Sequence, residues 1–495
     1  MTSEASGADE RAIAARNAVK LGLSLLATWG VALIVRFQLP RYLGPEAFGE
    51  YSFSESLAGA LAVALSLGVD TYAQRELPVR PGHASDYFGS VLVLRLAMMV
   101  PLAIAMWFGT KGAGHATNIA VLTLIFGAIC FVQALNSSFA CMLQASGKVD
   151  ALAIQNVVSK VLWGMGLMAL ILLGAPLLML AVPFLLSELI KAWVLFRATR
   201  RTIGLRLSVN FGVLRPILKV CVPFYLSMVA IALVNRVDIT LLGFLSNRAE
   251  LGWYGAAQNL AGLAMLLAPL VSWVFMPLFA RAHHRSEEEF FALLRRAIEG
   301  LLVASIPLTM VLGLGAELWI HLAFGDSFAP AAYSLRFLAP VFTATYLTML
   351  LANALIVANK GWQLTFITFG ALTLQMLMIP VLVPITSGMG PGGAGVGAAI
   401  AVTCMEVLTA IALFWFVGKK SVDRQSLYCI GLSLGIAAGV AFLDRLAFAD
   451  LNAILRLAID CAVYAALALG FKVVRLRDIK SAVALIRTRR QKPAA

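Results

Sequence analysis

The sequence Arg41-Tyr-Leu-Gly-Pro-Glu-Ala-Phe-Gly-Glu-Tyr51 follows the first long hydrophobic run of the chain. A shorter echo of it, Asn247-Arg-Ala-Glu-Leu-Gly-Trp-Tyr254, follows a later hydrophobic run. When Gly49 is aligned with Gly252, Tyr51 falls on Tyr254 and several residues beyond them also match. The chain therefore looks duplicated, and we predict two membrane lobes of common design, as many transporters have.

The composition is that of an integral membrane protein. Of the 495 residues, 61% are hydrophobic and 13% are charged, whereas soluble domains carry roughly 25% charged residues. Hydrophobic runs of about 20 residues recur along almost the whole chain, and each can cross a hydrocarbon core of roughly 30 Å as a helix. We predict an all-α membrane protein with about fourteen transmembrane helices. The predicted spans are 18–36, 53–72, 86–107, 117–140, 151–173, 177–196, 218–245, 253–280, 297–315, 332–357, 363–384, 395–417, 427–444 and 452–471.

Lysine and arginine residues are concentrated in every second loop, which predicts the topology. Because cytoplasmic loops are enriched in these residues, the alternation places both termini in the cytoplasm. The external side then holds few basic residues, namely Arg41, Lys111, Arg248, Arg445 and Arg456. The same asymmetry, with contact to anionic headgroups, accounts for the net charge of +14 without nucleic acid.

Two further echoes extend the duplication. Ala145 after the fourth span corresponds to Ala358 after the tenth, and Glu188 in the sixth span corresponds to Glu406 in the twelfth. Each copy then contains six spans, so both copies enter the membrane from the same side. We expect parallel repeats related by an axis along the membrane normal. The predicted domains are an N-lobe over residues 1–200, a C-lobe over 201–420, and two appended helices with a basic cytoplasmic tail over 421–495.

Several ionisable residues lie inside the predicted spans. An ionised side chain at the bilayer centre costs about 2.5–3.5 kcal/mol, so such residues usually face an interior cavity. Arginine binds phosphate with a planar fork of donors, and we therefore predict a cationic cavity for an anionic or pyrophosphate-bearing substrate. The candidate substrate-binding residues are Arg36, Arg95, Lys160, Arg236 and Arg336. Arg36 and Arg236 stand at equivalent positions of the two copies, just before the duplicated motif.

Simpler roles remain open for individual charged residues. Arg36 and Arg336 lie near span ends, from which an arginine side chain can extend to the membrane interface. Glu188 and Lys191 are three residues apart and can pair on one face of a helix.

The sequence lacks the signatures of an enzyme. It has no G-x-x-x-x-G-K-[ST] phosphate loop, and His283-His284 beside a run of glutamates is more typical of a solvated helix start than of a metal site. We therefore expect no catalytic residues, no metal site and no cofactor. Coupling to a proton or a sodium ion stays open, with Asp70 and Asp238 as weak candidates whose simpler role is a local salt bridge.

Three motifs carry a family resemblance. They are the segment 41–51, Ala249-Glu-Leu-Gly-Trp-Tyr-Gly-Ala-Ala-Gln258, and Gly395-Val-Gly-Ala-Ala-Ile-Ala-Val402. Together they resemble the Wzx-type polysaccharide flippases of the multidrug/oligosaccharidyl-lipid/polysaccharide exporter superfamily. The resemblance covers almost the whole chain and is specific for the superfamily rather than for one substrate. It implies two six-helix lobes around a V-shaped central cavity, with two further helices.

The resemblance also implies a function. Such a protein would move an undecaprenyl-pyrophosphate-linked oligosaccharide across the bacterial inner membrane by alternating access, for O-antigen, exopolysaccharide or capsule biosynthesis. Its partners would be the lipid-linked glycan, the bilayer, and a polysaccharide polymerase and glycosyltransferases of the same pathway. A cation-coupled multidrug exporter of the same superfamily is the nearest alternative and would favour acidic cavity residues. A membrane polysaccharide polymerase or ligase is a weaker alternative, because the predicted external loops are short.

Overall fold

The computed structural model describes most of the chain as helices. The described residues are 2–69, 84–146, 150–204, 208–209, 212, 225–226, 228–264, 268–421, 423–447 and 452–471. Every regular element within these ranges is helical, which confirms the predicted all-α class. Among the same residues, eight helices are long and apolar enough to cross a membrane, or nine if a bent pair forms one span. The total of fourteen stays a prediction.

The segment 41–51 lies within the long helical element α1 (Thr2–Ala62) rather than in a separate loop. The break in α1 is a single residue, Gly44, with φ 71° and ψ 174°. Glycine adopts this positive φ without steric strain. Pro45 then opens the next helical stretch, where its missing N–H group is not needed. The loop expected between the first two spans is thus reduced to one residue that redirects the chain.

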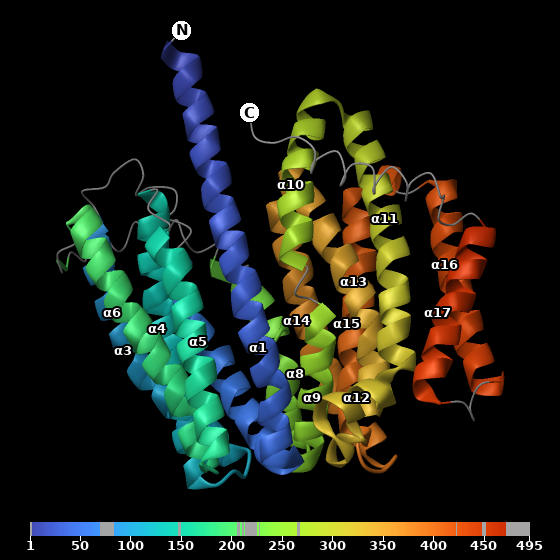
Figure 1. The fold of residues 1–495 in the computed structure, drawn as a ribbon, viewed down its shortest axis with the longest axis horizontal. Helices are drawn as coiled ribbons and strands as arrows, with labels where there is room; N and C mark the ends of the chain where they lie inside the picture. Colours follow the sequence, from blue (N-terminus) through green and yellow to red (C-terminus); the bar gives the residue numbers. More distant parts are fainter. Residues whose placement is uncertain are drawn as a thin grey trace. The chain divides into compact units, whose positions relative to one another are not determined.

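The chain divides into two compact units, and the first comprises Met1–Gly255. Figure 1 shows α3 to α6 running side by side within it, in agreement with the contacts between α3 and α4, α4 and α6, and α5 and α6. Their facing sides bury apolar side chains such as Met106, Phe126 and Leu167. The helices of this unit after α1 are η1 (Val63–Ser66), α3 (Ala84–Gly112), α4 (Thr117–Ala145), α5 (Asp150–Leu172), η3 (Leu177–Ala181), α6 (Val182–Ile203) and α8 (Val237–Leu245).

The second unit comprises Ala256–Ala495, and helix α9 (Arg248–Ala264) crosses the limit between the two units. Its core is apolar, and Phe279, Leu294 and Leu351 are completely buried there. The predicted appended pair, α16 and α17, pack against each other and against α11. The other elements of this unit are α10 (Ala268–Arg285), α11 (Glu287–Leu314), α12 (Ala316–Phe324), η5 (Asp326–Phe328), α13 (Ala331–Val357), α14 (Gly361–Ser387), α15 (Gly393–Val417), η6 (Lys419–Ser421), α16 (Arg424–Ala447) and α17 (Ala453–Gly470).

The packing pattern of the first unit recurs in the second. Helices α4 and α5 both contact α6, and in the same way α13 and α14 both contact α15. Glu188 in α6 accepts a hydrogen bond from Asn136 in α4, and Glu406 in α15 accepts one from Thr348 in α13. The two glutamates that were aligned from the sequence therefore make equivalent contacts, each with the corresponding helix of its own unit. This equivalence supports the duplication. The domain limits at residues 200 and 420 remain predictions.

The duplicated motif and its echo contact each other within the first unit. A Cβ atom on Gly49 would collide with the carbonyl oxygen of Arg248, and one on Gly252 would collide with the carbonyl oxygen of Pro45. Glycine is therefore required at both positions by the close approach of the other copy's backbone. An ion pair lies at the same place, with 2.9 Å between Arg248 Nη1 and Glu50 Oε1.

Candidate functional site

Lys160, on α5, places its ammonium group against two aromatic rings of the first unit. Its Nζ atom lies 4.5 Å from the ring centroid of Trp163 and 5.0 Å from that of Phe184. A cation over an aromatic face is attracted by about 0.5–2 kcal/mol. The two rings therefore fix the position of this predicted substrate-binding residue.

Lys160 belongs to a cluster of charged side chains on three helices, which we call the charged cluster of the first unit. Glu188 and Glu55 attract its ammonium group, whereas Lys191 and Arg36 repel it. Glu55 is exposed on α1, within the predicted second span. Sequence reasoning missed Glu55, although an ionisable residue inside a span was the signal that found the other members. The cluster carries charges of both signs.

Glu188 is bound to the neighbouring helix α4. Its carboxylate accepts a hydrogen bond from Asn136 Nδ2 at 2.7 Å, and its main-chain carbonyl accepts one from the same amide at 3.1 Å. The residue is only 5% exposed. From the sequence, Lys191 was a possible partner of Glu188 on the same helix. Asn136 belongs to a different helix, so spacing along one helix could not indicate it.

Arg236 lies at a break in a helix that was predicted as one continuous span. A short helical segment before it and α8 after it meet at an angle of 47°. Ser56 Oγ donates to the main-chain carbonyl of Arg236 at 2.7 Å, and Arg236 Nη1 donates to the Glu55 carbonyl at 3.4 Å. The guanidinium group occupies the place where a Cβ atom on Gly59 would stand. Arg236 therefore packs on α1 beside Glu55, and it extends the charged cluster.

The predicted matched pair, Arg36 and Arg236, consists of one exposed and one half-buried arginine on different elements. Arg36 is exposed on α1 and is close enough to Lys160 to repel it. Its exposure is compatible with ligand binding and with extension to the membrane interface, and its role stays a prediction.

Arg95, on α3, is fully buried, with 0% of its surface exposed. Its Nε atom donates to the Leu65 carbonyl at 2.7 Å, and Nη1 donates to the Ala134 carbonyl at 2.9 Å and to Ser138 Oγ at 2.8 Å. These bonds fasten the end of η1 to α3 and α4. In this conformation the guanidinium group faces protein atoms, and its part in substrate binding stays a prediction.

The two weak candidates for ion coupling differ in what the structure describes. Asp238 is 2% exposed, and its carboxylate accepts hydrogen bonds from Tyr254 Oη at 2.7 Å and from the Ile239 amide at 2.8 Å. Hydrogen bonds of this kind are the rule for buried polar groups. Asp70 lies outside the described residues. Ion coupling at either position remains a prediction.

An apolar groove with a volume of about 1290 Å³ lies in the second unit. Helices α11, α13, α15, α16 and α17 line it, from Gly418 and Ser421 at one end to Asp444 and Arg456 at the other. Its lining is mainly aliphatic and aromatic, and one wall residue, Ile411, is 58% exposed. We refer to this feature as the apolar groove.

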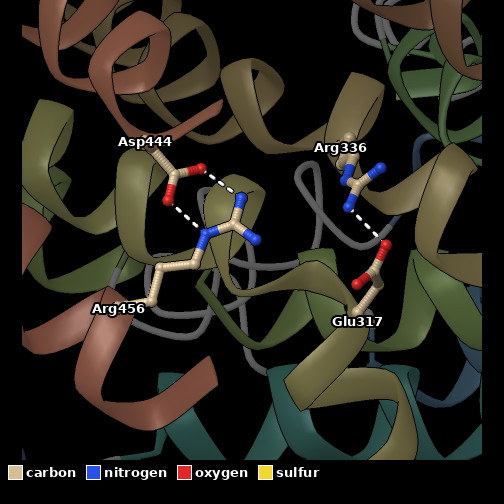
Figure 2. A network of polar contacts seen from close by, with 4 residues as sticks. All are labelled: Glu317, Arg336, Asp444 and Arg456. Atoms are coloured by element: carbon tan, nitrogen blue, oxygen red, sulfur yellow. Dashed lines mark hydrogen bonds and ion pairs between the residues drawn. The ribbon is translucent and has the colours of Figure 1, made fainter. Parts of the chain in front are cut away.

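Two arginines mark one end of the apolar groove. Arg336, predicted as a substrate contact, lines it, and its Nη2 atom donates to Glu317 Oε1 at 2.6 Å. Arg456 forms a bidentate ion pair with Asp444. Figure 2 shows both pairs, each of which joins two helices. The sequence singled out Arg456 only as an external basic residue, because the helix that carries its partner could not be placed beside it.

The sequence matches a known family over more than half of its length. The family described as polysaccharide biosynthesis protein matches residues 14–283. The chain belongs to the polysaccharide biosynthesis protein family. This membership confirms the resemblance carried by the three motifs. A search of curated proteins found no match to this chain.

The chain also shares its fold with solved transporters. The lipid II flippase MurJ in its inward closed conformation matches with a TM-score of 0.70 and 14% identity, over 94% of this chain and 99% of that chain. An inward-facing multidrug resistance transporter of the MATE family, from the MOP superfamily, matches with a TM-score of 0.61 and 16% identity, over 79% and 97% of the two chains. A variant of the Vibrio cholerae MATE transporter VcmN gives a TM-score of 0.54 and 14% identity, over 81% and 97%. The fold is therefore that of a MurJ- and MATE-like membrane transporter.

Proposed function

We propose that this polysaccharide biosynthesis protein is a flippase that moves an undecaprenyl-pyrophosphate-linked oligosaccharide across the bacterial inner membrane. The glycan would serve O-antigen, exopolysaccharide or capsule biosynthesis, and transport would proceed by alternating access with both termini in the cytoplasm. The observation that carries the proposal is the apolar groove with paired arginines at one end. Family membership and the resemblance to a lipid II flippase support it.

The apolar groove suits a long isoprenoid chain. Its lining covers residues 302–314 of α11 and 336–347 of α13, so it extends for roughly 18 Å, more than half of the roughly 30 Å of a hydrocarbon core. Lipid tails are as apolar as leucine side chains, so a chain that enters the groove exchanges lipid contacts for similar protein contacts. The groove would therefore guide the chain along the membrane rather than trap it.

The arginines at the end of the groove suit a pyrophosphate. A guanidinium group binds phosphate oxygens through two parallel hydrogen bonds. Arg456 now makes two such bonds with the carboxylate of Asp444, and Arg336 makes one with that of Glu317. A phosphate would have to displace a carboxylate, which limits its affinity and permits the release that transport requires.

The charged cluster of the first unit suits the polar head of the same molecule. Lys160, Arg36 and Arg236 offer cationic donors for phosphate, and carboxylates such as that of Glu55 accept hydrogen bonds from sugar hydroxyls. A mixed set of this kind matches a head that is anionic at the pyrophosphate and neutral along the glycan.

A cation-coupled multidrug exporter is the second candidate. The fold shared with MATE transporters favours it, as do the acids Glu55 and Glu188 around Lys160, whose ammonium group lies on the rings of Trp163 and Phe184. Acids and aromatic rings together attract organic cations. The apolar groove, at about 1290 Å³, exceeds the roughly 300–1,000 Å³ that is usual for small-ligand sites, and this difference makes the lipid-linked glycan the stronger proposal.

Deletion of the gene in its host tests the proposal. We expect undecaprenyl-linked oligosaccharide to accumulate on the cytoplasmic side and surface polysaccharide to disappear, with both restored by the wild-type gene. Intact surface polysaccharide without accumulation would refute the flippase. Efflux of ethidium measured in the same strains tests the second candidate, because a drug exporter would lose efflux and keep the polysaccharide.

A further inference from the structure

Two buried aspartates lie next to each other at one end of the apolar groove. Asp444 on α16 and Asp460 on α17 are each 1% exposed, and their carboxyl groups are within hydrogen-bonding reach of each other. Asp444 lines the groove, whereas Asp460 is not part of the lining. Arg456, which is bonded to Asp444, was assigned to the external side from the distribution of basic residues. The two residues, which we call the aspartate pair, therefore belong to the predicted external half of the membrane.

The two members of the aspartate pair differ in their hydrogen bonds. Both carboxylate oxygens of Asp444 accept from Arg456. Among the described residues, neither carboxyl oxygen of Asp460 has a hydrogen-bond donor. Buried polar atoms are normally bonded, so Asp460 lacks something that its site requires. An ionised Asp460 meets only another acceptor at Asp444, whereas a proton on Asp460 turns the same contact into a hydrogen bond.

The surrounding charges also favour one proton on the aspartate pair. The described charged groups that act on Asp460 are Asp444 and Arg456, and Arg456 lies one helical turn away on α17. Glu317 acts on Arg456 as well, but it has an arginine partner of its own (Figure 2). Helix α11 packs against both α16 and α17, and its groove-lining stretch 302–314 contains no ionisable residue. One guanidinium group therefore faces two buried carboxyl groups.

We propose that the aspartate pair is a proton-binding site, and that its proton controls how readily Arg456 binds the pyrophosphate of the substrate. For its ligand, the inference rests on the proposed flippase function. With one proton on the pair, Arg456 faces a single negative charge, and its side chain, 26% exposed, is available to phosphate. Without the proton, two negative charges hold the guanidinium group and repel an approaching phosphate. Proton and phosphate therefore favour each other's binding, because coupling between two sites is reciprocal.

Infrared spectroscopy of the purified full chain in lipid nanodiscs tests the proton site. A protonated carboxyl group and an ionised one have different stretching bands, so the difference spectrum between pH 5.5 and pH 8 reports the acids that titrate. We expect the wild type to show a buried carboxylic acid that Asp460→Asn lacks. Asp326→Asn is the matched control and should resemble the wild type, because Asp326 is an exposed acid of the same unit. Equal difference spectra for the wild type and Asp460→Asn would overturn the site.

Binding of inorganic pyrophosphate to the same proteins, measured by calorimetry, tests the control of Arg456. Pyrophosphate itself titrates, and the ratio of two proteins' affinities at one pH removes this effect. From pH 5.5 to pH 8 we expect the wild type to lose about tenfold in affinity relative to Asp460→Asn, because the amide imitates the protonated acid and cannot ionise. Asp326→Asn should follow the wild type, and Arg456→Gln should bind weakly at both pH values.

A ratio of affinities that does not change with pH would overturn the control of Arg456, as would undiminished binding to Arg456→Gln. If Asp460→Asn does not fold, Asp460→Leu takes its place in both measurements, since it also removes the acid from a position without a donor.

The proton site and the flippase can fail separately, because both measurements use purified protein and a soluble probe. If deletion of the gene leaves surface polysaccharide intact, the proposed function is wrong, and the proton site still stands or falls by the two measurements. If deletion abolishes export while Asp460→Asn matches the wild type in both measurements, the flippase stands and the proton site is wrong.

Discussion

The two units of the molecule handle charge in opposite ways. In the first unit, Lys160 and Glu188 lie along the lengths of helices, and they are held by aromatic rings or by an amide of a neighbouring helix. In the second unit, the apolar groove has ionic pairs at one end, where Arg336 and Arg456 each pair with a carboxylate. The first unit thus offers charged side chains on its helices, and the second offers an apolar groove with ion pairs at one end.

The comparison shows that the two copies share their helix packing but differ in the position of their charged side chains. Helices α4 and α5 both contact α6, as α13 and α14 both contact α15. An amphiphilic substrate needs both kinds of surface, because its head and its chain differ in polarity. We therefore expect substitutions in the first unit to affect head recognition and substitutions in the groove to affect chain recognition.

The largest expected effect comes from Arg95 of the first unit, and it shows whether this charged residue stabilises the fold or binds the substrate. Arg95→Ala would leave the acceptors at Leu65, Ala134 and Ser138 without their buried donor, at a cost of at least about 3 kcal/mol. Loss of folded protein from the membrane, measured by immunoblot and thermal unfolding in detergent, is the expected result. Arg285→Ala is the control, since its exposed pair with Glu289 contributes about 0.3–0.5 kcal/mol. Normal protein levels with export abolished would instead identify Arg95 as a substrate contact.

The next effect tests whether the first unit recognises the head. Lys160→Leu should lower glycan export about 10- to 100-fold, the equivalent of roughly 1.5–3 kcal/mol for a charged hydrogen bond, while the protein remains folded. Surface polysaccharide restored to the deletion strain provides the measurement. Lys111→Leu is the control, because Lys111 is exposed and donates to Thr117 outside the cluster. Equal export by both variants would contradict a head site at Lys160.

A smaller effect tests whether the groove of the second unit accommodates the chain. Ala437 lines the groove, and Ala437→Phe should fill part of it and lower export about tenfold, or roughly 1.4 kcal/mol. Ala438 is the neighbouring residue on α16, is exposed and does not line the groove, so Ala438→Phe should export normally. The same assay of restored surface polysaccharide applies. If both variants export alike, the groove has no part in transport.

The smallest effect concerns pH and the turn that carries His115. Its pKa is lowered in the folded protein, so as pH falls below about 6.5 the unfolded chain takes up a proton first and the folded state loses stability. Above that pH both states are neutral and no effect remains. Arg248, which pairs with Glu50, is the charged group that acts on the ring, and Glu46 lines the same cavity as His115. Thermal unfolding at pH 7.5 and 5.5 should show a larger drop for the wild type than for His115→Gln, and equal drops would show that His115 does not titrate in this range.

The sequence predicted the membrane class, the helical fold and the family, because these depend on hydrophobic runs and on motifs that are local in the chain. It also aligned Gly49 with Gly252 and Glu188 with Glu406, and these pairs occupy equivalent or contacting places in the structure. Two copies of a sequence pack in the same way, so aligning the copies predicts some contacts between segments that are distant in the chain.

The partners of the charged residues could not be predicted in the same way. The bonds of Arg95 join three separate elements, and the pair of Arg456 with Asp444 joins two helices. Such contacts depend on helix rotation and depth, which a run of apolar residues does not specify. Gly44 illustrates a further limit, since one residue with positive φ replaced an expected loop.

The backbone contact at Gly49 and Gly252 also restricts how the two copies can diverge. A larger residue at either position displaces the main chain of the other copy, at Arg248 or at Pro45. No change of side chain elsewhere can make room, because main-chain atoms form the obstacle. Among relatives, the two glycines should therefore be inherited together, and a relative that loses one should carry a shifted or lengthened turn at the other.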